Sequence, residues 1–144
     1  MAIMNKMSDT FFRKLFFWGA LWNISAALTG LFFYNFLFSL FFGPESLIDN
    51  FYQVLAFKMS MLAILLFGIG YYIVSKELTL NRAIVWLGMI GKIVLFFIFA
   101  YYFIEGKATF VAFMVFFGDF IWAILFAMFL YQTREEVKFN NLIG

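Results

Sequence analysis

Four long apolar runs dominate the sequence and limit what the chain can fold into. They cover residues 15–38, 54–75, 83–104 and 108–131, and each approaches the roughly 20 residues that an α-helix needs to cross about 30 Å of hydrocarbon. None alternates between apolar and polar residues as a strand with one wet face would. Because lipid offers the backbone no hydrogen-bond partner, each run must satisfy its own N–H and C=O groups, which requires a helix. The sequence therefore predicts an all-α polytopic membrane protein.

The connections between the runs decide how the helices are arranged. The second and third, KELTLNR and EGK, are short, so consecutive helices should lie antiparallel and side by side. We expect an antiparallel bundle of four transmembrane helices, forming a single domain over residues 1–144. The first connection is longer, and its proline predicts a helix that begins after Pro44. Leu47, Ile48 and Phe51 would place that helix on the membrane surface.

The composition excludes several kinds of site. Only 12% of the residues are charged, against roughly 25% in globular chains, which agrees with a membrane protein. The absence of cysteine and histidine removes disulfides, thiol nucleophiles and imidazole ligands. We therefore expect no metal site and no cofactor, and these residue types favour a protein that is not an enzyme. The net charge of +2 is too small to indicate a nucleic-acid partner.

Basic residues lie mainly on one side of the predicted bundle. In the loops of the opposite side, Lys107 is the only basic residue. By the positive-inside rule, the side richer in Lys and Arg faces the cytoplasm, so the sequence predicts a multi-pass inner-membrane protein with cytoplasmic N- and C-termini. The first run exceeds the roughly 7–15 residues of a signal-peptide core and should be retained as a helix. The basic residues on the cytoplasmic side are Lys6, Arg13, Lys14, Lys76, Arg82, Arg134 and Lys138.

A lysine in the middle of the third run is the most unusual feature of the sequence. At about 1.5 Å per residue, Lys92 lies about 14 Å from the cytoplasmic side. Asp119, in the antiparallel fourth run, lies about 18 Å from the same side, and Asn23 of the first run about 12 Å. These matching depths predict a polar layer near the midplane. We expect Trp22 and Trp122 to flank this layer and to face the bundle interior.

Small residues predict where the helices approach one another. In the third run, Gly88 precedes Lys92 by one helical turn. Small side chains allow close packing, which drives helix association in lipid. In the first run, small and polar residues recur at three- and four-residue steps at Gly19, Asn23, Ala26, Ala27, Gly30 and Tyr34.

Three functions fit the polar layer. Ionisable residues inside a membrane are functional candidates, so the first is the binding of a lipid or another small amphipathic molecule, for example by an accessory subunit. Lys92 would hold an anionic or carbonyl head group, Asp119 would keep Lys92 charged, and Asn23 would add a hydrogen bond. Trp22 and Trp122 would wall this ligand-binding site. The alternatives are a small proton-coupled transporter that uses Asp119, and a structural subunit in which Lys92 and Asp119 form a clamp.

The partners expected from the sequence follow from these functions. They are membrane lipid, a small amphipathic ligand, and a second copy of the chain or another membrane protein. The sequence does not choose among them.

Four short stretches are similar to a known group of proteins. They are LFFWGALWNISAALTG in the first run, GPESL in the outer connection, NRAIVWLGMIGK at the third run and FFGDFIWAILF in the fourth. With them the chain resembles the DoxX-like group of small bacterial inner-membrane proteins. The resemblance implies a four-helix bundle and, as for some members, a quinone or a redox partner. It assigns no role to any residue.

Overall fold

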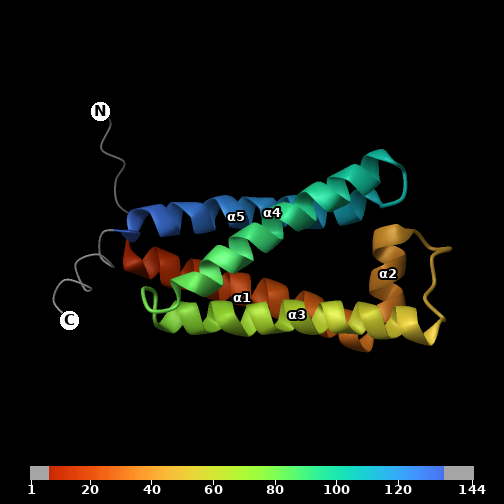
Figure 1. The fold of residues 1–144 in the computed structure, drawn as a ribbon, viewed down its shortest axis with the longest axis horizontal. Helices are drawn as coiled ribbons and strands as arrows, with labels where there is room; N and C mark the ends of the chain where they lie inside the picture. Colours follow the sequence, from red (N-terminus) through yellow and green to blue (C-terminus); the bar gives the residue numbers. More distant parts are fainter. Residues whose placement is uncertain (1–6, 135–144) are drawn as a thin grey trace.

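The computed structural model describes residues 7–134, and this part of the chain is helical with no strand (Figure 1). Four of its helices are long and apolar enough to cross a membrane, so the protein is a multi-pass membrane protein, as predicted. The helices are α1 (Asp9–Phe32), α2 (Tyr34–Phe42), α3 (Phe51–Lys76), α4 (Arg82–Ile104) and α5 (Phe110–Gln132).

Polar caps set where three of the spanning helices begin. The side chains of Ser8, Asn50 and Thr109 accept hydrogen bonds from backbone N–H groups in the first turns of α1, α3 and α5. Such caps satisfy N–H groups that have no partner within the helix. Because Ser8 caps α1, this helix begins at Asp9, six residues before the predicted start at 15. The other spanning helices begin within three residues of their predicted starts.

The run predicted as one helix over 15–38 forms two helices. The chain leaves helical geometry at Phe33, whose φ and ψ are −125° and 49°, and α2 then runs across one end of the molecule (Figure 1). The apolar side chains of α2 explain this turn. Leu37 and Phe41 are buried, and the Phe41 ring lies 5.7 Å from the ring of Phe116 in α5. The protein thus has a fifth helix that closes one end of the bundle.

The helix predicted to follow Pro44 is absent. Residues 44–50 form a turn and irregular structure, which follows Gly43 at a φ of 104°. Ile48 is 3% exposed, and its N–H donates to Asn35 Oδ1 at 3.2 Å. Because Ile48 is held against α2 by this bond, it does not lie on the membrane surface as predicted.

The spanning helices form two closely packed pairs. α1 packs mainly against α3, and α4 packs mainly against α5. α3 and α4 adjoin near their short connection and diverge toward the end where α2 lies (Figure 1). Two apolar clusters hold the pairs together, one at each end of the molecule. The first includes Phe12, Phe16, Tyr71, Phe126 and Phe129. The second includes Leu37, Phe41, Met61, Ala112 and Phe116.

Two arginines secure the end of the molecule opposite α2. Arg13 of α1 donates to the carbonyl oxygen of Ser75 at 3.1 Å and to that of Lys76, at the end of α3. Arg82 of α4 donates to the carbonyl oxygen of Leu130 at 2.9 Å, near the end of α5. The last carbonyls of a helix lack partners within it, so each arginine stabilises a helix end on a neighbouring element.

Candidate functional site

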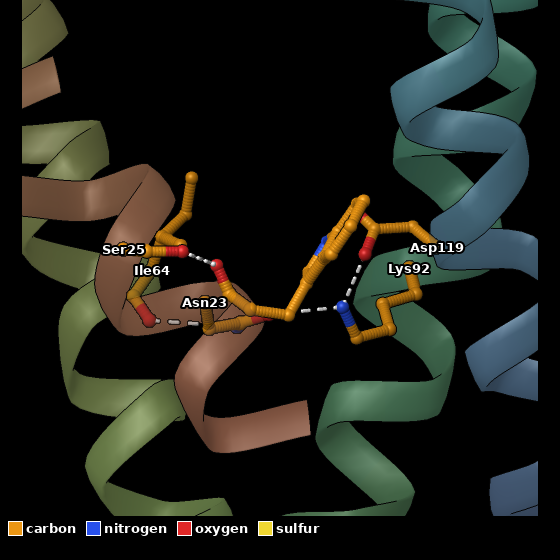
Figure 2. A network of polar contacts seen from close by, with 6 residues as sticks. Asn23, Ser25, Ile64, Lys92 and Asp119 are labelled. Atoms are coloured by element: carbon orange, nitrogen blue, oxygen red, sulfur yellow. Dashed lines mark hydrogen bonds and ion pairs between the residues drawn. The ribbon is translucent and has the colours of Figure 1, made fainter. Parts of the chain in front are cut away.

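Lys92, Asp119 and Asn23 meet in the interior of the bundle (Figure 2). The Lys92 ammonium group donates to Asp119 Oδ1 and, at 3.1 Å, to Asn23 Oδ1. The three residues are buried, with exposed fractions of 5% for Lys92, 8% for Asp119 and 7% for Asn23. The predicted ion pair is therefore confirmed, and Asn23 joins it as the depth estimate indicated.

These contacts connect the two helix pairs. Lys92 and Asp119 belong to α4 and α5, whereas Asn23 belongs to α1. The Asn23 amide also donates to the Ile64 carbonyl oxygen of α3 at 3.5 Å, a long contact (Figure 2). Polar contacts between helices are favoured in lipid because water cannot replace them. The polar layer thus links all four spanning helices through side chains and one carbonyl group.

A cavity of about 330 Å³ lies beside the ion pair. Lys92 and Asp119 are its charged lining residues, and most of the others are apolar. Side chains of α2 contribute to its wall, so the turn at Phe33 also shapes this cavity. The lining residues are Asn23, Ala26, Leu37, Phe41, Ser60, Met61, Ala63, Ile64, Phe67, Tyr71, Leu87, Gly88, Gly91, Lys92, Leu95, Val115, Phe116 and Asp119.

The cavity has a rim between α3 and α4. Ser60 and Ala63 of α3 and Leu87 of α4 line the cavity and are also exposed on the outside of the molecule. Gly91 of α4 lines it as well, and a Cβ atom built there would meet no heavy atom within 4 Å. Because α3 and α4 both span the membrane, the rim faces the bilayer. A molecule would therefore enter the cavity from the lipid rather than from water.

Tyr71 belongs to this site, although the sequence did not point to it. Its ring centroid lies 5.8 Å from Lys92 Nζ, within the range of a cation–π contact. Gly88 makes room for the ring, since a Cβ atom on Gly88 would lie 2.1 Å from the Tyr71 hydroxyl oxygen. The position of Gly88 one turn before Lys92 was the available signal, but it did not identify the aromatic residue that fills the space.

The two tryptophans do not wall the site as predicted. Trp22 is 41% exposed, and its ring lies 3.6 Å from where a Cβ atom on Gly118 of α5 would stand. In the same way, the ring of Trp122 in α5 lies 3.7 Å from where a Cβ atom on Gly19 of α1 would stand. Neither residue lines the cavity. The tryptophans pack α1 against α5 outside the ligand-accessible space.

The small-residue stripe of the first run is partly in helix contacts. Gly19, Ala27 and Gly30 are buried, and a Cβ atom on Gly30 would collide with Met61 of α3. Ala26 lines the cavity, and Tyr34 begins α2. The stripe therefore predicts the packing face of α1 correctly as far as the break at Phe33.

The described residues contain no group of three Asp, Glu, His or Cys side chains arranged to hold a metal ion. Comparisons with known proteins found no matching family model, no similar curated protein and no similar solved structure. The cavity and the polar residues at its wall are therefore the features that indicate a function.

Proposed function

We propose that this membrane protein binds a small amphipathic molecule in the cavity between its two helix pairs. The observation that carries the proposal is a largely apolar cavity of about 330 Å³ with Lys92, Asp119 and Asn23 in its wall. Ligand sites commonly combine apolar walls with a few convergent polar groups. A lipid, a quinone or a similar molecule would place its polar group at these residues and its apolar part against the walls.

Gly91 allows this proposal to be tested. In a Gly91→Leu variant, the new side chain would begin in open space at the rim, since no heavy atom lies within 4 Å of its Cβ, and it would obstruct the rim. Lipids that co-purify with the protein in mild detergent would be extracted and identified by mass spectrometry. We expect one lipid species to be enriched with the unmodified protein and lost from Gly91→Leu. Ala83→Leu is the matched control, because Ala83 is exposed on the same helix and does not line the cavity.

The opposite result would count against ligand binding. A lipid profile that matches the bulk membrane in all three proteins would leave the cavity without a retained ligand. Loss of the enriched lipid from Ala83→Leu as well as from Gly91→Leu would place the lipid on the outer surface of α4 rather than in the cavity.

One observation favours a second role for the same residues, that of a structural clamp. Lys92 donates to side chains of two other helices, α5 through Asp119 and α1 through Asn23. A buried ion pair whose partners are both held by hydrogen bonds can fix how helices are placed against one another. This role is compatible with ligand binding and is measured separately, through stability.

We also propose that the protein lies in a bacterial inner membrane with its basic end in the cytoplasm. Basic residues lie near the start of α1, on either side of the α3–α4 connection and just after the end of α5. They are Arg13 and Lys14, Lys76 and Arg82, and Arg134. These segments share one end of the molecule (Figure 1), which supports the positive-inside assignment. Lys6 and Lys138 lie outside the described residues. The DoxX-like resemblance, with its quinone or redox partner, stays a prediction.

A further inference from the structure

The Tyr71 hydroxyl is the group that indicates what kind of head group the cavity takes. Tyr71 is 1% exposed, yet its hydroxyl makes no hydrogen bond with any residue from 7 to 134. A buried hydroxyl without a partner costs free energy and is uncommon in native structures. In the same part of the chain, no fully enclosed side-chain N or O atom lacks a hydrogen bond. Because the Tyr71 hydroxyl has no hydrogen bond, it is not one of these fully enclosed atoms. It must therefore be open to the cavity that Tyr71 lines.

The ion pair leaves further hydrogen-bonding capacity beside Tyr71. An ammonium group has three N–H donors, and Lys92 uses them for two bonds within the described chain. Asp119 accepts through Oδ1, and its Oδ2 makes no hydrogen bond with these residues. The polar wall therefore offers donors from Lys92 and Tyr71 and acceptors from Asp119 and the Tyr71 oxygen. A hydroxyl group both donates and accepts, so it matches this set.

The charges of the wall disfavour an anionic head group. Lys92 and Asp119 are the charged residues that line the cavity, and they neutralise each other. A carboxylate or phosphate would face Asp119 and bring an unbalanced negative charge into a largely apolar space, which is costly. A neutral head group avoids this cost and leaves the ion pair intact.

The size of the cavity indicates where the rest of the molecule lies. A volume of about 330 Å³ is at the lower end of the roughly 300–1,000 Å³ that ligand sites span. It holds a head group and the first part of a chain, but not a full-length lipid. The rim between α3 and α4, where Leu87 is 60% exposed, adjoins the bilayer, so the remaining chain would extend there into the surrounding lipid.

We infer that the cavity binds a neutral, hydroxyl-bearing lipid that enters sideways from the bilayer between α3 and α4. Its hydroxyl group lies between Tyr71 and the Lys92–Asp119 pair, and Tyr71 is a ligand-contacting residue in addition to those expected from the sequence. This inference rests on the proposed function and narrows its ligand to one chemical class.

The test compares two probes that share one chain and differ in the head group. Tritiated oleyl alcohol and tritiated oleate are bound to the purified full chain in mild detergent, at an alkaline pH that ionises oleate, and binding is measured by scintillation proximity. We expect saturable binding of oleyl alcohol that is at least about tenfold tighter than that of oleate. Tyr71→Phe should weaken alcohol binding about two- to tenfold, as the loss of one hydrogen bond does.

Stability measurements separate a ligand contact from a structural role. Tyr71→Phe removes an unpartnered buried hydroxyl, so its thermal midpoint without ligand should equal or exceed that of the unmodified protein. Tyr101→Phe is the matched control, because Tyr101 is 57% exposed near the end of α4 and does not line the cavity. This control should change neither binding nor stability.

Each contrary outcome has a distinct meaning. Oleate that binds as tightly as the alcohol, with both lost in Gly91→Leu, would overturn the neutral class and leave the proposed function standing. Alcohol binding that Tyr71→Phe does not weaken, or a loss of stability in that variant without ligand, would overturn the role of Tyr71.

If neither probe binds saturably while a lipid of another class co-purifies, the inference fails alone. If nothing binds or co-purifies, the proposed function fails with it.

Discussion

A Cβ atom placed on Gly68 of α3 would lie 3.2 Å from the backbone nitrogen of Ile24 in α1. The two helices therefore approach each other closely at this point, as small residues allow in membrane proteins. The same Cβ atom would lie 3.2 Å from Cβ of Asn23, the residue that joins α1 to the ion pair. This close contact between α1 and α3 thus lies beside the polar layer.

Gly68→Ala should destabilise the protein by about 1–3 kcal/mol, as overpacking of a tight contact does. The added methyl group has the α1 backbone on one side, and a backbone cannot turn away as a flexible side chain can. The measurement is the free energy of unfolding in mixed detergent micelles. Gly91→Ala is the control, since no heavy atom lies within 4 Å of its new Cβ. Its stability should be unchanged or higher by up to about 1 kcal/mol. Equal stability of the two variants would contradict the close approach of α1 and α3.

Lys92→Met and Asp119→Leu test whether the ion pair clamps the fold. Each single change leaves one buried charge without its partner, which should cost about 3 kcal/mol or more. The double variant removes both charges, so it should recover much of that loss. Unfolding free energies of the four proteins give the coupling energy directly. Single variants as stable as the unmodified protein would rule out a clamp and would favour a site retained for binding.

The polar layer was predictable because helix depth follows from residue number. Once the runs were taken as antiparallel helices, a fixed rise per residue placed Asn23, Lys92 and Asp119 at similar depths. The same reasoning could not place Trp22, which adjoins Asn23 in the sequence. Successive residues on a helix point in different directions, so when Asn23 faces the interior, Trp22 turns toward α5 and the lipid.

The break at Phe33 and the role of Tyr71 depend on tertiary packing. No proline or glycine marks residues 31–36, and the turn is explained by Leu37 and Phe41, which pack against helices that are distant in the sequence. Tyr71 lies in an apolar run that fits any spanning helix. Its role in the site depends on the space that Gly88 of α4 leaves for its ring and on the cavity beside it. Both are formed by several helices together, so the sequence of one segment does not predict them.

Arg13→Gln should loosen the end of α3 that lies beside α1. The Arg13 guanidinium donates to the carbonyl oxygens of Ser75 and Lys76, and hydrogen bonds to charged groups contribute about 1.5–3 kcal/mol each when buried. These bonds are partly exposed, so we expect a total loss of about 1–2 kcal/mol. Hydrogen exchange should also quicken in the last turn of α3.

Lys14→Gln is the matched control for Arg13→Gln. Lys14 follows Arg13 in the same turn of α1, and its substitution removes the same charge. Its side chain makes no hydrogen bond or ion pair with the described residues. We expect its stability to change by less than about 0.5 kcal/mol. If both variants lose the same stability, the effect comes from the charge of this end of the molecule and not from the hydrogen bonds of Arg13.

The orientation in the membrane is open to a direct test because the chain has no cysteine. Glu77→Cys places one thiol in the α3–α4 connection, and Lys107→Cys places one at the opposite end, where the Lys107 side chain is 65% exposed. The positive-inside rule predicts that a membrane-impermeant maleimide labels position 107 in right-side-out vesicles and position 77 in inverted ones. Phe97→Cys is the control, because Phe97 lies within α4 and is exposed toward lipid, so it should be labelled in neither. The reverse pattern would invert the orientation, whereas labelling of 77 and 107 from one side would contradict a membrane-spanning α4.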